Sequence, residues 1–185
     1  MIAHPDIKNE RYYGWALTKN IAITLKKISK QIEFEKFDVF FSKDETHISE
    51  NFLYSGEVKK NESKQYGIIK NKHGVEKFSP DFVKDEGVLI YKSKKGLIIF
   101  IGCGHRGVID IIEYAKKMTG IKNVYAVIGG LHLRYASPLK LLMIRKYIKK
   151  ENISHIYACH CSGAWGRLWL PNAKNLSTGQ SIEFD

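Results

Sequence analysis

Three segments in the second half of the chain share one layout, and this layout constrains the fold more than any other feature. In each segment an apolar run typical of a buried strand is followed by small residues and a histidine. The runs are Leu97–Ile101, Val124–Ile128 and Ile153–Ala158, and the histidines are His105, His132 and His160. Buried strands deliver side chains to one edge of a sheet, where α/β proteins keep their sites. The pattern therefore predicts that the three histidines meet at one sheet edge.

Strand and helix signals alternate through this region. Val88–Tyr91 and Leu97–Ile101 predict a hairpin. Apolar residues at helical spacing predict a helix over Val108–Thr119, followed by Gly120 at its C-terminal cap. Ser137, directly before a proline, predicts the N-cap of a second helix that runs to Lys150. From Val88 onward the order β-β-α-β-α-β indicates an α/β fold.

The remaining segments give weaker signals. Pro5 favours the first turn of a helix, with no strand before it. Residues 21–32 fit a short amphipathic helix or an irregular connection, and residues 59–77 fit a polar surface excursion. We expect strands at Phe37–Phe41 and Phe52–Val58, and an edge strand at Gln180–Phe184.

Length and composition describe an ordinary globular chain. At 185 residues and 44% hydrophobic content, one domain with a sizeable core is expected. Three cysteines are an odd number, which argues against a disulfide framework and for a reducing compartment. The sequence has no apolar run long enough to span a membrane and no signal-peptide pattern, so we expect a cytoplasmic protein without a membrane partner.

The net charge of +11 raises the question of nucleic-acid binding. The lysines are scattered, and no basic stripe with interleaved aromatic residues stands out. A general compositional bias explains the charge better than a nucleic-acid site does.

The histidines lie beside three cysteines, and zinc and related ions bind imidazole nitrogen and thiolate sulfur. Cys159 and Cys161 would face the same way in an extended backbone and His160 the other way, so the spacing alone does not assign all three to one ion. The chain has no Cys-x-x-Cys pair, Gly-x-Ser-x-Gly elbow or phosphate-binding P-loop. The alternative is that these histidines are structural hydrogen-bonding residues and that Cys103 and Cys159 are small buried hydrophobes. His47 and His73 lie in polar context and are expected at the surface.

At these residues the chain resembles the metallo-β-lactamase superfamily, and within it the branch similar to 7,8-dihydropterin-6-methyl-4-(β-D-ribofuranosyl)-aminobenzene-5′-phosphate synthase. The branch has a Gly-Cys-Ser-His-x-Gly-Ile segment, a Gly-Gly-Phe-His-Leu segment and a Cys-His-Cys-Thr-Gly segment. They match, in order, Gly102–Val108, Gly129–Leu133 and Cys159–Gly163, and Ala3–Asp6, Ser55–Val58 and Pro80–Phe82 fit as well. The resemblance covers nearly the whole chain.

The resemblance implies an αββα sandwich, of which residues 1–185 form an incomplete domain. The superfamily's His-x-His-x-Asp-His motif lies upstream of the segment that matches Ala3–Asp6, and these 185 residues do not contain it. We therefore expect the C-terminal two thirds of such a domain, without its first strands, and a sheet with an exposed edge.

The resemblance also implies a set of site residues. His105, His132, His160 and Cys103 are the predicted metal ligands, with Cys103 where many members of the superfamily place a bridging aspartate. Arg106 is predicted to meet a phosphate or carboxylate of the substrate, and His4 to support the substrate site. The expected cofactor is a divalent metal ion, zinc or else manganese or magnesium, which binds poorly if the upstream ligands are missing. No catalytic residue is assigned.

Three functions remain open at this point. The first is a metal-dependent hydrolase that acts on a small phosphate- or ester-bearing metabolite through a dinuclear centre, completed by a second chain that carries the missing half. The second is a non-catalytic fragment. The third is a basic nucleic-acid-binding module, for which we find no separate motif.

Overall fold

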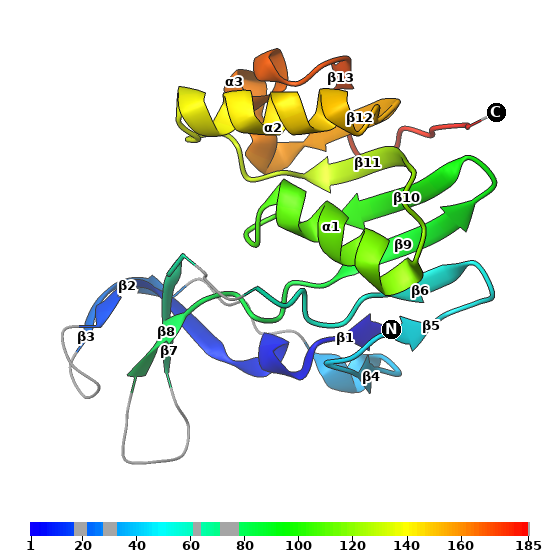
Figure 1. Cartoon of the computed structure of the whole chain (residues 1–185). Coiled ribbons are helices and arrows are strands. Elements are labelled where there is room, and N and C mark those ends of the chain that lie inside the picture. Colours follow the sequence, from blue (N-terminus) through cyan, green and yellow to red (C-terminus); the bar gives the residue numbers. More distant parts are fainter. Residues whose placement is uncertain (17–21, 28–32, 61–63, 71–77, 185) are drawn as a thin grey trace. The chain divides into compact units, whose positions relative to one another are not determined.

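The computed structural model describes residues 1–16, 22–27, 33–60, 64–70 and 78–184. These residues form two compact units. Unit 1 comprises Met1–Asp44 with Gly56–Glu86, and unit 2 comprises Glu45–Ser55 with Gly87–Asp185. Each unit has its own sheet or sheets (Figure 1). Within the described residues, no helix is long and apolar enough to cross a membrane.

Unit 2 contains a seven-stranded mixed sheet, counted over the described residues, in the order β13-β12-β11-β10-β9-β6-β5. Strands β10 to β13 run parallel, and β9, β6 and β5 continue the sheet in antiparallel pairs. The strands are β5 (Thr46–His47), β6 (Phe52–Tyr54), β9 (Val88–Ser93), β10 (Gly96–Ile101), β11 (Val124–Gly130), β12 (His155–Cys159) and β13 (Ala173–Lys174). The hairpin predicted in this region is the β9–β10 pair, and the predicted α/β class is confirmed.

The register of the parallel strands places the three histidine-bearing segments at one edge. Ile101 at the end of β10 pairs with Gly129, and Gly130 at the end of β11 pairs with Cys159. The carboxyl ends of three neighbouring strands therefore lie side by side, as parallel strands with helical crossovers require.

The helices of unit 2 are α1 (Val108–Thr119), α2 (Pro138–Lys150), α3 (Gly163–Trp169) and the 3₁₀ turn η3 (His160–Ser162). Helix α1 has the predicted bounds and ends at Gly120, whose φ of 71° suits a residue without a side chain. Helix α2 begins after Ser137, whose hydroxyl accepts a hydrogen bond from the Lys140 amide, as a serine N-cap does. The sequence did not predict α3.

The unit 2 sheet packs on both faces. The Ile98, Ala126 and Ile128 side chains form a buried cluster against which Ile182 and Phe184 pack from the C-terminal segment. The predicted edge strand at 180–184 is therefore wrong, because these apolar side chains cover a sheet face and do not pair along an edge. The strands at the two edges of this sheet are β13 and β5.

Unit 1 contains two smaller sheets. Strands β1 (Ile2–Ala3) and β4 (Phe40–Phe41) pair in parallel, and β3 (Ala22–Lys27), β2 (Glu10–Ala16), β7 (Gly67–Lys70) and β8 (Phe78–Asp81) form an antiparallel sheet in that order. The 3₁₀ turns are η1 (Pro5–Lys8) and η2 (Phe34–Lys36).

Several predictions for unit 1 and its boundary need correction. A strand precedes Pro5, and the turn at Pro5 is 3₁₀. The segment 21–32 contains β3 where a helix or an irregular connection was expected. The strands expected at Phe37–Phe41 and Phe52–Val58 shorten to β4 and β6, and part of the excursion 59–77 forms β7. Pairing with other strands decides these segments, since β4 pairs in parallel with β1, β3 and β7 pair antiparallel with β2, and β6 pairs antiparallel with β9. Local periodicity does not reveal such pairing.

Arg11 in β2 forms ion pairs with two aspartates of unit 1. Its Nε lies 2.8 Å from an Asp81 carboxylate oxygen, and its terminal nitrogens donate to Asp85 at 2.8 and 2.7 Å. The three side chains are 14%, 3% and 12% exposed. Burial lowers the pKa of Arg11, but the Asp85 and Asp81 carboxylates outweigh it and raise that pKa. The guanidinium therefore neutralises two carboxylates that are largely removed from water.

Candidate metal centre

Glycines allow the three strand ends to approach one another. Gly129 has a φ of 132°, and a Cβ there would lie 1.8 Å from the Ile101 carbonyl oxygen. Gly104 has a φ of 73°, and a Cβ there would lie 2.8 Å from the Gly130 carbonyl oxygen. The Gly130 amide donates to the Gly102 carbonyl at 3.3 Å. The small residues after each apolar run are therefore needed for close backbone contact between neighbouring strand ends.

The predicted ligands of unit 2 lie in two overlapping groups that share Cys103. One group contains Cys103, His105 and His132, and the other contains Cys103, His160 and Cys161. Within each group the ligand atoms lie within 4.8 Å of one another. The Cys103 sulfur lies 3.7 Å from His132 Nδ1 and 3.2 Å from the Cys161 sulfur. The structure therefore brings together three strand ends that lie far apart in the sequence.

The loop after β11 is fixed against η3 by a series of hydrogen bonds. The Leu131 amide donates to the Ser162 hydroxyl at 3.1 Å, and the His132 amide donates to the Cys161 sulfur at 3.2 Å. The Arg134 amide and guanidinium donate to the carbonyls of Cys161 and His160. His132 itself has a φ of 50°, a strained conformation for a residue other than glycine. These bonds hold that conformation and so aim the His132 imidazole.

Cys161 is the residue that the sequence prediction left out of the ligand set. The prediction considered an extended backbone in which Cys159 and Cys161 face the same way. In the structure β12 ends at Cys159 and the 3₁₀ turn begins at His160, so the alternation stops there. Cys161 joins the cluster, whereas Cys159 lies outside both ligand groups. The one sequence signal for Cys161 as a ligand is the match of Cys159–Gly163 to the Cys-His-Cys-Thr-Gly segment of the superfamily branch.

The cluster favours the protonation states that bind metal. A hydrogen bond from the Cys103 thiol, with smaller effects from the His132 amide and the nearby imidazoles, lowers the pKa of Cys161 to about 5 against its desolvation. When protonated, the Cys161 thiol can instead donate to the Cys103 carbonyl at 3.2 Å. Burial, followed by the neighbouring His105 imidazole, lowers the pKa of His132. Thiolate sulfur and neutral imidazole are the forms that act as ligands.

The donor set fits a divalent metal ion of zinc type. Thiolate and imidazole ligands suit zinc, whereas manganese and magnesium prefer oxygen ligands. Gly130 leaves space for two of the donors, since a Cβ at this position would lie 2.3 Å from His160 Cε1 and 2.7 Å from the Cys161 sulfur.

The two predicted substrate residues lie in different units. Arg106 of unit 2 lies in the turn before α1 and is 4% exposed. His4 of unit 1 is 2% exposed, and its Nδ1 accepts a hydrogen bond from the Asp6 amide at 3.1 Å, which caps η1. His47 is exposed and lies 3.1 Å from a Glu45 carboxylate oxygen. His73 lies outside the described residues.

Comparison with known proteins gives the class. The structure matches that of Tm1679, a metal-dependent hydrolase of the β-lactamase superfamily, with a TM-score of 0.81 and 19% sequence identity, over 99% of this chain and 70% of the other. The chain therefore has the fold of the metallo-β-lactamase superfamily, as the sequence motifs predicted. No protein-family model matches the sequence.

Two curated proteins of Methanocaldococcus jannaschii are similar in sequence. The first is 7,8-dihydropterin-6-methyl-4-(β-D-ribofuranosyl)-aminobenzene-5′-phosphate synthase, 32% identical over 151 residues that cover 77% of this chain and 50% of that protein. The second is the uncharacterized protein MJ0448, 31% identical over 166 residues that cover 88% of this chain and 58% of that protein. The predicted resemblance is confirmed, and the chain spans about half the length of the curated relatives it matches.

Proposed function

We propose that the chain supplies the cysteine- and histidine-bearing side of a metal-dependent hydrolase-type site that acts on a small phosphate- or ester-bearing metabolite. The two overlapping ligand groups around Cys103 carry this proposal. The similarity to a metal-dependent hydrolase and to a synthase whose name contains a phosphate supports the metal and the substrate class. Sulfur and imidazole donors favour zinc over manganese or magnesium.

The proposed centre is dinuclear, with Cys103 shared between two ions. His105 and His132 serve one ligand group, and His160 and Cys161 serve the other. A bound divalent ion would supply Lewis-acid polarisation of a phosphoryl or carbonyl oxygen and an acidified water. The chain's own residues hold the ligand atoms together, and burial lowers the pKa of His132, which favours the neutral imidazole that binds metal.

Each group offers three ligands from this chain, and the His-x-His-x-Asp-His ligands of the superfamily are not among the 185 residues. We therefore propose that full activity needs ligands from residues outside them, supplied by a complementing chain or by a longer polypeptide. Without those further ligands, the chain alone should bind zinc without turning over substrate. The alternative is a non-catalytic role in which the chain only binds metal.

The test is metal analysis of the purified chain by elemental mass spectrometry after zinc loading and dialysis. We expect Cys103→Ser to lower the zinc content most, because it removes the shared ligand, and His105→Ala and His160→Ala each to affect one group. Cys159→Ala is the matched control, because it removes a neighbouring thiol that lies outside both groups. A metal-free parent chain, or equal zinc content in all variants, would refute the proposed centre.

Activity is measured separately with a generic chromogenic phosphodiester and added zinc or manganese. The chain alone should give no useful turnover. Robust turnover that is lost in His160→Ala would show that the 185 residues carry a complete site and would overturn the requirement for further ligands.

A further inference from the structure

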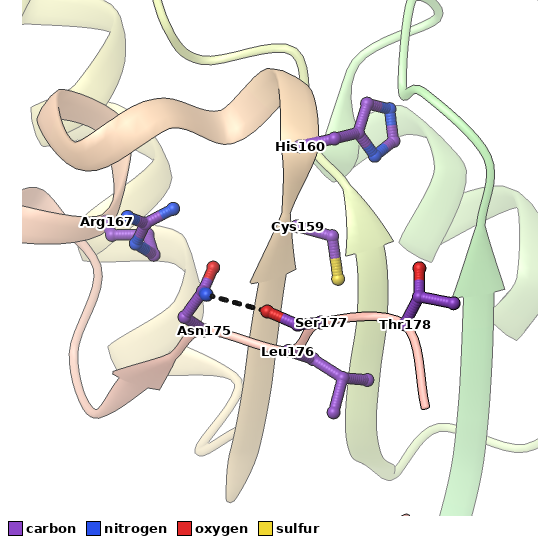
Figure 2. Close-up of a pocket in the computed structure, with 7 residues that line it drawn as sticks. All are labelled: Cys159, His160, Arg167, Asn175, Leu176, Ser177 and Thr178. Carbon is purple, nitrogen blue, oxygen red and sulfur yellow. Dashed lines mark hydrogen bonds between the residues drawn. The ribbon is translucent and has the colours of Figure 1, made fainter. Parts of the chain in front are cut away.

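Beside the proposed metal ligands, unit 2 has a pocket of about 600 Å³ at the carboxyl end of β12 (Figure 2). Its walls come from the end of β12, from α3 and from the segment that follows β13. This volume lies within the range of about 300–1,000 Å³ that small-molecule sites occupy. His160 lines the pocket and also belongs to the ligand group of Cys103 and Cys161. A molecule in the pocket would therefore reach the metal cluster.

The residues that line the pocket favour an anion. Arg167 contributes a positive charge, and none of the described residues in the wall is acidic. Asn175, Ser177 and Thr178 add neutral groups that can donate hydrogen bonds. The planar guanidinium fork of arginine matches the oxygens of a phosphate and binds it with charge-assisted hydrogen bonds. A cation would find no compensating charge in this wall.

The polar side of the pocket is held in place by its own hydrogen bonds. Asn175 Nδ2 donates to the Ser177 hydroxyl oxygen at 3.5 Å, the bond that Figure 2 marks. The Ser177 amide donates to Gln180 Oε1 at 2.7 Å, and the Gln180 amide donates to the Ser177 carbonyl at 3.2 Å. Because Ser177 accepts from Asn175, its hydroxyl proton remains free to turn toward a ligand oxygen.

The pocket also has an apolar side suited to a carbon skeleton. Leu176, which lies between Asn175 and Ser177, and Cys159, the last residue of β12, both line the pocket. In Figure 2, Arg167 lies to the left of the end of β12, and Cys159 and His160 lie to its right, with His160 above Cys159. A ligand with its phosphate at Arg167 would therefore extend its other end past Cys159 toward the metal cluster.

We propose that this pocket binds a small organic phosphate monoester, with the phosphate at Arg167 and the Ser177 hydroxyl and the carbon skeleton directed toward His160. The proposal deepens the proposed function, since it states which part of the site recognises the substrate. It assigns recognition to groups that do not ligate metal. Binding can therefore be tested without any metal in the protein.

The test is isothermal titration calorimetry of the whole chain in the presence of a chelator, with ribose 5-phosphate, ribose and inorganic phosphate as probes. We expect ribose 5-phosphate to bind, ribose to give no detectable heat, and inorganic phosphate to bind more weakly than the ester. Arg167→Gln should weaken ribose 5-phosphate binding about tenfold or more, the loss of at least one charge-assisted bond. Ser177→Ala, at an exposed position that should tolerate it, should weaken binding by a smaller factor.

Lys174→Gln is the matched control, because it removes one exposed positive charge next to the pocket and Lys174 does not line it. We expect this variant to bind as the parent does. Equal weakening by Lys174→Gln and Arg167→Gln would show diffuse attraction to a basic chain and would overturn the proposal. So would the absence of ester binding, or inorganic phosphate binding as tightly as the ester. The chelator separates this result from zinc binding, so failure of one proposal does not imply failure of the other.

Discussion

Adding a single methyl group at Gly130 should disturb the proposed metal ligands while leaving the rest of the fold intact. Gly130 ends β11 and is buried beneath the second ligand group. Its backbone does not need the left-handed region, so alanine is permitted there on conformational grounds. A Cβ at this position would nevertheless lie 2.3 Å and 2.6 Å from His160 Cε1 and Nε2 and 2.7 Å from the Cys161 sulfur. Gly130→Ala therefore perturbs two proposed ligands at once.

The size of the effect follows from these distances. Carbon atoms rest about 3.5–4.0 Å apart, so the His160 ring would have to retreat by about 1 Å or more. Metal–ligand distances tolerate about 0.2 Å. Even residues that only support a ligand change metal affinity about 10–100-fold when mutated, so displacing two ligands should cost at least about tenfold in zinc affinity, or about 1.4 kcal/mol.

The assay is a competition titration against a chromogenic zinc chelator, with circular dichroism and thermal melting to confirm that each variant folds. Gly102→Ala is the matched control, since it lies in the first motif beside Cys103 and a Cβ there would meet nothing within 4 Å. We expect Gly102→Ala to keep the parent affinity. If a folded Gly130→Ala chain also kept it, His160 and Cys161 would not hold the ion, and the second ligand group would have to be abandoned.

Three further predictions follow. Gly129→Ala should destabilise unit 2 by about 3 kcal/mol or more with or without zinc, because its φ of 132° is unfavourable for alanine and a Cβ would clash with the Ile101 carbonyl. Denaturant unfolding of the metal-free chain tests this, and destabilisation seen only with zinc would contradict it. Arg11→Ala should cost about 3–5 kcal/mol by leaving two buried aspartates uncompensated, whereas loss of the exposed Lys36 ion pair should cost less than about 1 kcal/mol; equal effects in urea denaturation would refute the difference. Zinc at about 100 times its dissociation constant should stabilise the chain by about 2.7 kcal/mol, and a chelator should reverse this in thermal melts; a melting temperature independent of zinc would exclude binding to the folded state.

The sequence predicted the second half of the chain well because its signals are local and agree with one another. Helix α1 combines a regular apolar spacing with a glycine at its end, and α2 begins with serine and proline, so capping and periodicity give the same bounds. Strands β10 and β11 are nearly continuous apolar runs, as expected for strands buried on both faces. In unit 1, β1 pairs with β4 and β2 pairs with β7, which are partners distant in sequence, and this information is absent from any single window.

The candidate site was predictable only as far as the strand ends could be located. His105, His132 and His160 follow apolar runs, and parallel pairing brings the carboxyl ends of such runs to one edge. Cys161 could not be assigned, because its orientation depends on where β12 stops and the 3₁₀ turn starts. That boundary decides whether Cys161 joins the cluster, and strand boundaries are the least predictable part of a sequence analysis.

The glycines of the three motifs connect the fold to the chemistry. Gly129 lets β11 lie against the end of β10, Gly104 lets the turn after β10 lie against the end of β11, and Gly130 leaves space for His160 and Cys161. Each removes a side chain where two strand ends converge, and at Gly130 the position that a Cβ would fill is approached by ligand atoms of His160 and Cys161. The same convergence makes Cys103 common to both ligand groups, because its sulfur lies 3.7 Å from His132 Nδ1 and 3.2 Å from the Cys161 sulfur. A site built in this way depends on backbone proximity more than on any one histidine, and for that reason a substitution that adds one carbon atom should be as damaging as one that removes a ligand.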